Sequence, residues 1–311
     1  MDSIPPQFGF TGRTSLHDCP STQGLMMTPT FSLPMPRLSA FATAGALALL
    51  LAACGPTGRS VSTAGVAELE QRSEATETNL ASLNQVVAAN PNTPEPYNTR
   101  GAAYARIGRF QEAITDFSTA IKLDPNNVAA YTNRALAYRQ INRNDAAMSD
   151  FNAAISVNPR HAPAFLGRAN LYRAQGLLSE AMGDLDVAIR LNPEAAPAFH
   201  ARGLIWQRQG NHARAITDFD NAIDRDPFAS APYLARGQSL IMVGKYEAAI
   251  EDFNATLNVD NRSGDAWAGL GLAYERQGNR SKAVESYQRA LIVDNSSKLA
   301  RDGLARLGVR A

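Results

Sequence analysis

The chain has 311 residues, of which 45% are apolar and 19% charged, so it can form a buried core and lacks the composition of a disordered protein. Its 30 basic and 29 acidic side chains are mixed along the sequence and leave a formal net charge of +1, which gives no reason to expect nucleic acid as a partner. The two cysteines, Cys19 and Cys54, precede the regular part of the chain and the four histidines are scattered, so we expect no disulfide framework, metal site or cofactor.

Residues 1–34 are rich in proline, serine and threonine. They would form an unusually long polar stretch in front of the segment that follows. We interpret them as a doubtful extension and expect translation to start at Met35, with Met26 and Met27 as alternatives.

Residues 35–53 have the pattern of an export signal, because Arg37 precedes an apolar run of small and aliphatic residues. The run is shorter than the stretch of about 20 apolar residues that a spanning helix needs. It ends in Leu51-Ala52-Ala53-Cys54, which resembles the lipobox of bacterial lipoproteins. The resemblance implies cleavage before Cys54, a diacylglyceryl group on its thiol and an acylated amino group, which together form a permanent membrane anchor. The alternative is an ordinary signal peptide that contains a cysteine.

Residues 54–68 start with this cysteine and continue without hydrophobic periodicity, which predicts a flexible tether. Gly55, rather than an aspartate, follows the cysteine. By resemblance to enterobacterial lipoproteins, this favours the bacterial outer membrane, with the protein facing the periplasm.

Residues 94–297 repeat six times with a period of 34 residues. Each unit opens with an aromatic residue, and a small residue follows four positions later. An alanine, another bulky residue and a closing proline come next, although asparagine replaces the proline in the last two units. The opening residues are Tyr97, Tyr131, Phe165, Phe199, Tyr233 and Trp267.

This pattern resembles the tetratricopeptide repeat. The resemblance implies an all-α fold, namely a right-handed α-solenoid of about six helix-turn-helix repeats. A glycine, or Asn142 in the second unit, would allow the turn between the two helices of a unit. Residues 69–93 match the pattern poorly and predict a degenerate cap, and residues 298–311 predict a capping helix.

An arginine recurs on the first helix of five units, and an aspartate follows it sixteen residues later on the second helix. The arginines are Arg100, Arg134, Arg168, Arg202 and Arg236, and the aspartates are Asp116, Asp150, Asp184, Asp218 and Asp252. The sixth unit has Leu270 and Ser286 instead. Because both charges are lost together, we predict an ion pair within each unit. The alternative is a ladder of arginines that binds phosphate or sulfate.

No catalytic motif is present: the sequence has no Gly-x-Ser-x-Gly elbow, phosphate-binding glycine loop or His-Glu-x-x-His pair. We therefore expect a scaffold and not an enzyme. By resemblance to the family, partners would bind the concave face, which the first helices line.

Leucines on this face predict a groove for an apolar peptide or helix, and two arginines predict a contact with an acidic group. The candidate groove residues are Asn98, Leu136, Arg139, Leu166, Asn170, Arg173, Leu204, Leu234, Ile241 and Leu272. The alternative is that some of these leucines pack against the next helix.

The partners would be other proteins or peptides, together with the membrane through the lipid on Cys54. Lipid-anchored tetratricopeptide proteins include adaptors for peptidoglycan hydrolases and assembly factors for pili or secretion channels. We expect the adaptor role first and the assembly role as the alternative, and the sequence leaves the oligomeric state open.

Overall fold

A computed structural model describes residues 79–310 of the chain. The doubtful extension, the signal peptide, Cys54 and the tether predicted from the sequence lie outside these residues. Of the degenerate cap expected over residues 69–93, the described part includes a helical stretch at residues 79–89.

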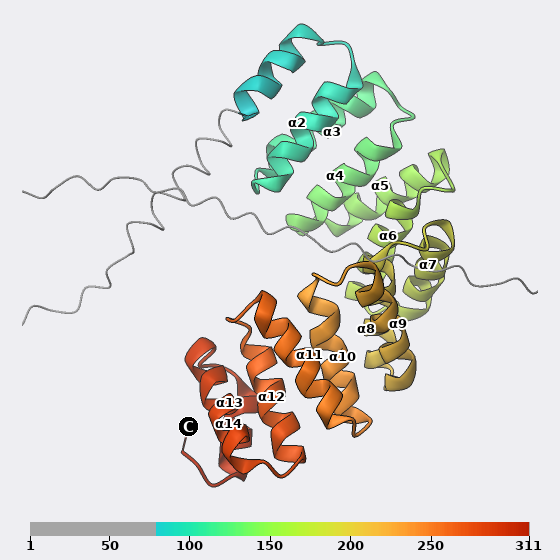
Figure 1. Cartoon of the computed structure of the whole chain (residues 1–311). Coiled ribbons are helices and arrows are strands. Elements are labelled where there is room, and N and C mark those ends of the chain that lie inside the picture. The colour runs from blue at the N-terminus through green and yellow to red at the C-terminus, as the bar shows by residue number, and fades with distance from the viewer. Residues whose placement is uncertain (1–78, 311) are drawn as a thin grey trace, which may run out of the picture. The chain divides into compact units, whose positions relative to one another are not determined.

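Every regular element within residues 79–310 is a helix. The helices that follow the stretch at 79–89 are α2 (Pro94–Arg106), α3 (Phe110–Leu123), α4 (Val128–Gln140), α5 (Asn144–Val157), α6 (Ala162–Gln175), α7 (Leu178–Leu191), α8 (Ala196–Arg208), α9 (His212–Arg225), α10 (Ser230–Met242), α11 (Tyr246–Val259), α12 (Gly264–Arg276), α13 (Arg280–Val293) and α14 (Lys298–Arg306). Consecutive helices form antiparallel pairs, each packed on the next pair along the chain (Figure 1). The predicted all-α stack of helix pairs is confirmed.

The turn inside each pair needs a residue in the left-handed region of backbone space. Glycine fills this place in five pairs, with φ between 76° and 81°, because it has no Cβ to clash. In the second pair Asn142 has φ 58°, and asparagine tolerates this conformation better than most residues. The six turns thus have one geometry, as the sequence predicts.

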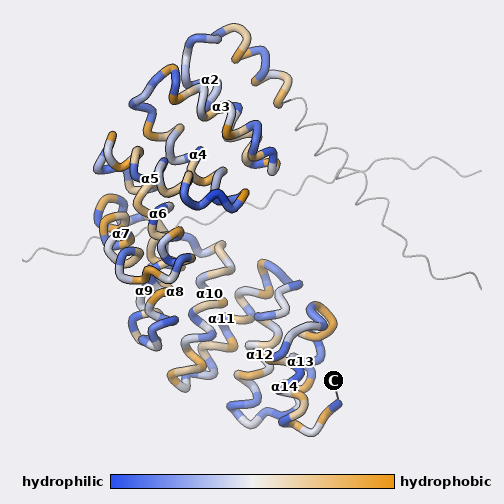
Figure 2. The backbone as a smooth tube through the Cα atoms, turned by 180° about the vertical axis from the view of Figure 1, so that it is seen from behind, coloured by the Kyte–Doolittle hydropathy of each residue, from blue (hydrophilic) through white to orange (hydrophobic). Residues whose placement is uncertain are grey.

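A large side chain from each second helix fills the centre of its unit. These residues are Phe117, Phe151, Leu185, Phe219, Phe253 and Tyr287, and each exposes at most 1% of its surface. Small residues on the facing first helix make room for them: a Cβ added to Gly203 would lie only 2.6 Å from Cε1 of Phe219. Apolar and polar stretches alternate along the helices (Figure 2), and the buried apolar residues form a series of clusters along the stack.

The first helices of the pairs line the inner face of the stack. Each of them contacts the first helix of the next pair, as α4 does with α6 and α6 with α8. Within the described residues, no second helix contacts the second helix of the next pair. The pairs therefore lie closer together along their first helices, which places α2, α4, α6, α8, α10 and α12 on the concave side.

The predicted ion pair is present in all five units that have both charges. In the third unit, Arg168 donates from Nε and Nη2 to the two carboxylate oxygens of Asp184, at 2.7 and 2.8 Å. Asp184 is buried, and its bidentate partner gives it the charge-assisted hydrogen bonds that a buried carboxylate needs. In the sixth unit Leu270 is buried instead, and Ser286 donates to the backbone oxygen of Lys282. The arginines are therefore used within the fold and do not form an anion-binding ladder.

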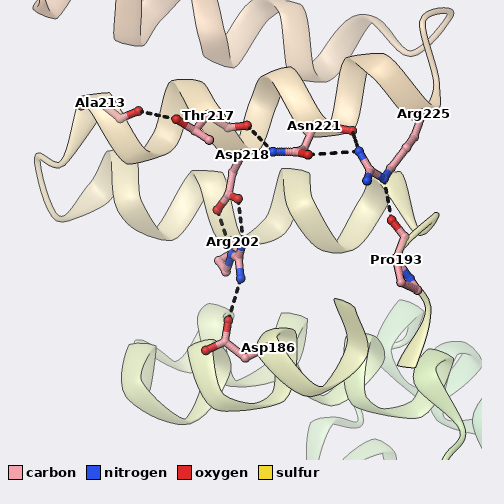
Figure 3. A network of polar contacts seen from close by, with 8 residues as sticks. All are labelled: Asp186, Pro193, Arg202, Ala213, Thr217, Asp218, Asn221 and Arg225. Atoms are coloured by element: carbon pink, nitrogen blue, oxygen red, sulfur yellow. Dashed lines mark hydrogen bonds and ion pairs between the residues drawn. The ribbon is translucent and has the colours of Figure 1, made fainter. Parts of the chain in front are cut away.

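The same arginine also reaches the preceding unit, which the sequence pattern did not predict. Arg202 bonds Asp218 of its own unit and, through Nη1, Oδ1 of Asp186 on α7 at 2.7 Å (Figure 3). The equivalent acceptors in the other units are Asn84, Ser118, Asn152 and Asp220. Arg225 adds a second link between the same two units, because it donates to the backbone oxygen of Pro193. Each interface between these units is thus joined by polar bonds as well as by apolar packing.

The last helix, α14, closes the apolar end of the sixth unit. Its Leu304 is fully buried and packs in one cluster with Tyr287. Glu275 on α12 accepts hydrogen bonds from Arg306 at 2.8 Å and from the Tyr287 hydroxyl at 2.6 Å. Arg306 and Tyr287, in that order of importance, hold the pKa of Glu275 below its ordinary value. A core contact and a charged contact therefore fasten α14 to the stack.

Candidate functional site

The candidate groove residues all lie on the first helices, and the structure distributes them along the inner face. They come from α2, α4, α6, α8, α10 and α12, so the groove runs across the units and is not confined to one of them. The burial of these residues differs from unit to unit, and this difference separates binding surface from core.

Leu136 is the most open of the apolar candidates, with 40% of its surface exposed. It lines a hollow of about 290 Å³ between α2, α3 and α4, together with Ala102, Ala105 and Ala137. Because the first unit has alanines where other units have larger side chains, nothing fills this space. The hollow is large enough for one apolar side chain of a bound segment.

The other apolar candidates are half-buried, and each packs at the margin of the core. Leu166 contacts the core cluster of the third unit, and Leu204 that of the fourth. Leu234 and Ile241 pack together against the fifth unit, and Leu272 packs against the sixth. These residues therefore serve the core and present only part of their surface to the groove.

The polar candidates fall into two groups. Asn98 is used within the fold, because its Oδ1 accepts a hydrogen bond from Asn133 of the next unit at 3.1 Å. Asn170, Arg139 and Arg173 are half-buried, and their side chains make neither a hydrogen bond nor an ion pair with any described residue. The second group is thus available to a ligand.

His200, on α8, belongs to the same part of the groove, although the sequence pattern did not single it out. Its ring lies 5.9 Å from that of Phe219, measured between centroids. Burial and the positive charge of Arg173 lower the pKa of His200 below its ordinary value. Both effects favour the neutral ring, which can donate one hydrogen bond and accept another.

Other kinds of site are absent from the part of the chain that the structure describes. Within residues 79–310, no group of three or more His, Cys, Asp or Glu side chains could hold a metal ion. None of the helices in that range combines the length and apolar character needed to cross a membrane.

Solved structures of several different proteins have the same fold. A component of the APC/C hetero-tetramer Cut9-Hcn1 has a TM-score of 0.66 and 20% identity, over 75% of this chain and 47% of that one. PilF of Pseudomonas aeruginosa has a TM-score of 0.63 and 17% identity, over 68% and 97%. The type IV pilus biogenesis factor PilW has a TM-score of 0.60 and 19% identity, over 68% and 98%. This chain thus spans about half of the Cut9-Hcn1 chain and nearly all of the two others.

Sequence comparison identifies the repeats directly. No curated protein matches the chain. A family model described as "TPR repeat" matches residues 106–141, and one described as "Tetratricopeptide repeat" matches residues 132–196, 166–230, 200–257 and 234–300. These repeats form scaffolds that bind proteins and carry no catalytic machinery, so the chain is a scaffold and not an enzyme. Since the matches cover more than half of the sequence and agree with the helix pairs, the chain belongs to the tetratricopeptide repeat family.

Proposed function

We propose that the chain is a lipid-anchored scaffold of the bacterial cell envelope, which holds partner proteins in the groove formed by its first helices. In this proposal it acts as an adaptor that brings peptidoglycan enzymes to the outer membrane from the periplasmic side. The observation that carries the binding role is the inner face itself, where an exposed leucine borders an unfilled apolar hollow. A solvated face has no structural need for such a leucine.

The location rests on the sequence of the amino terminus. An export signal that ends in Leu-Ala-Ala-Cys provides both a route out of the cytoplasm and a site for acylation at Cys54. A tether between Cys54 and the first helices would allow the groove to reach partners at some distance from the membrane.

Replacing Cys54 by serine should release the protein from membranes or leave its signal uncut, because acyl chains would be its strong apolar anchor. Membrane fractionation, palmitate labelling and mass spectrometry of the mature amino terminus measure these outcomes. Normal maturation of the variant with unchanged membrane attachment would contradict the lipoprotein assignment. So would a mature amino terminus that precedes residue 54 in the unchanged protein.

Leu136→Asp should abolish the capture of partners from envelope extracts while it leaves the melting temperature nearly unchanged. The charge is introduced beside the hollow, where an apolar partner residue would lie, and an exposed position contributes about 0.5 kcal/mol or less to folding. Affinity purification with quantitative mass spectrometry compares the variant with the wild type.

Val259→Asp is the matched control, because Val259 is 57% exposed but lies on α11, which is a second helix and not one of the first helices that form the groove. It should retain every partner. If both variants capture the same proteins as the wild type, the binding surface lies elsewhere.

The role as an assembly factor for a pilus or secretion complex is the alternative, and PilW shares the fold over nearly its whole length. Peptidoglycan hydrolases among the lost proteins would support the adaptor role, whereas pilus or secretion subunits would support assembly.

A further inference from the structure

Charge is distributed unequally between the two faces of the stack, although the whole chain is nearly neutral. The first helices α4, α6, α8 and α10 contain no aspartate or glutamate. Each has an arginine that is paired with the aspartate of its own unit, and three further arginines, Arg139, Arg173 and Arg208, lie on the same helices. The three further arginines therefore give these helices positive charge that no carboxylate on the same helices neutralises.

Arg139 and Arg173 come from adjacent first helices and lie close enough to repel each other. Burial, and then the charge of Arg173, lower the pKa of Arg139 below its ordinary value. No carboxylate contributes to the shift at Arg139 or to the one at His200. In addition, Nε of Arg173 is buried and has no hydrogen-bond partner. A half-buried cation next to another is unfavourable unless an anion compensates it.

In two other units, the residue equivalent to Arg139 and Arg173 forms hydrogen bonds within the fold. Gln207, which is equivalent to Arg173 in the fourth unit, donates to the backbone oxygen of Ala235 at 2.9 Å and to the hydroxyl of Ser239 at 3.0 Å. Glu275 in the sixth unit bonds Arg306 and Tyr287. These side chains join neighbouring elements of the stack. The two arginines make no such bond, so their polar groups remain available.

We propose that Arg139, Arg173 and His200 anchor a carboxylate of a bound peptide, which belongs to an acidic segment of a partner protein. Guanidinium groups match carboxylates in shape and bind them with paired, charge-assisted hydrogen bonds. Leu136, one helical turn before Arg139, would place an apolar side chain of the same peptide in the hollow. The ligand is therefore an acidic residue with an apolar neighbour. This inference rests on the proposed use of the inner groove and adds the chemistry that the groove selects.

The test uses random peptides displayed on phage and selected on the immobilised full chain. Peptides that bind the wild type should be enriched in aspartate or glutamate next to leucine, isoleucine or phenylalanine. Peptides selected on the variant Arg139→Gln/Arg173→Gln should lack the acidic enrichment.

The most enriched peptide is then made synthetically for affinity measurements. Its Kd for the double variant should be about ten-fold or more above its Kd for the wild type, and added salt should raise the Kd for the wild type. Replacing the peptide's acid by its amide should raise Kd similarly, and the two changes together should add little.

Controls separate this anchor from general effects. Arg208→Gln removes an exposed arginine from the same inner face and should leave Kd within about two-fold of the wild-type value. The melting temperature of Arg139→Gln/Arg173→Gln should hold or rise, because the change removes repulsion between half-buried cations. A marked fall in melting temperature would show that the arginines hold the fold, and would overturn the proposal.

The remaining outcomes identify which idea has failed. If the selected peptides lack acids and bind the double variant as well as the wild type, the carboxylate anchor is wrong but the groove stands. If Leu136→Asp does not weaken peptide binding either, the proposed groove is wrong too.

A last comparison measures binding to vesicles of phosphatidylglycerol and to vesicles of phosphatidylcholine. Arginine-dependent binding to the anionic vesicles alone, without peptide binding, would assign the cluster to lipid headgroups and overturn the peptide assignment.

Discussion

Arg168→Leu is expected to lower the free energy of unfolding by about 3 kcal/mol, because it leaves the carboxylate of Asp184 buried without its bidentate partner. It also removes the bond from Arg168 to Asn152 of the preceding unit, at 2.7 Å. Loss of an exposed ion pair would lower the free energy of unfolding by only about 0.2–1 kcal/mol, so a larger loss would indicate that the pair is buried. Urea unfolding followed by circular dichroism measures it.

The double variant Arg168→Leu/Asp184→Ser should recover most of this loss. It gives the third unit the pair that the sixth unit has naturally, in which Leu270 and Ser286 are both buried. Arg208→Leu, at an exposed arginine with no ion pair in the described structure, should change stability by about 0.5 kcal/mol or less. Purely additive losses in the double variant would contradict a direct coupling between Arg168 and Asp184.

Leu304→Ala is expected to lower stability by about 2–4 kcal/mol, because Leu304 is fully buried against Tyr287 and its loss leaves a cavity. The effect should be local, since each helix pair contacts only its neighbours. Hydrogen exchange should accelerate in α12, α13 and α14 and stay unchanged in α2 and α3. Mass spectrometry of peptic fragments measures both regions in one experiment.

Leu299→Ala is the matched control on the same helix, because Leu299 is 39% exposed. It should change stability by about 0.5 kcal/mol or less. Uniformly faster exchange along the whole stack of the Leu304→Ala variant would mean that the described region unfolds as one cooperative unit. That result would contradict the model in which stability accumulates from one interface to the next.

The repeat architecture was predictable because its determinants recur at a fixed period. Small residues, aromatics and turn residues return every 34 positions, and each has one physical role that the structure confirms at Gly203, Phe219 and Asn142. The Arg–Asp pair was predictable because both charges disappear together in the sixth unit. The bond from each arginine to the preceding unit was not, because its acceptor varies among asparagine, serine and aspartate and so leaves no periodic signal.

The binding surface was only partly predictable. A position on the inner face of a helix is exposed or packed according to the size of the side chain on the neighbouring helix, which the repeat pattern leaves free. Leu136 faces the alanines of the first unit and stays open, whereas Leu204, at the same position of its own unit, packs against the core of the fourth unit. His200 was not among the predicted groove residues, because nothing in the sequence relates it to Arg173, which lies on another helix.

Because each paired arginine bonds both its own unit and the preceding one, its bonds determine which changes in the number of units the fold tolerates. Each arginine finds one partner sixteen residues before it and another sixteen residues after it. If a whole unit of 34 residues is duplicated or deleted in the middle of the stack, the same spacings reappear at the junction, and no compensating substitution is needed. A gene can therefore gain or lose an inner unit in one recombination event. The sixth unit has Leu270 at this position, so a copy of it placed between two others would lack the polar bond to the unit before it.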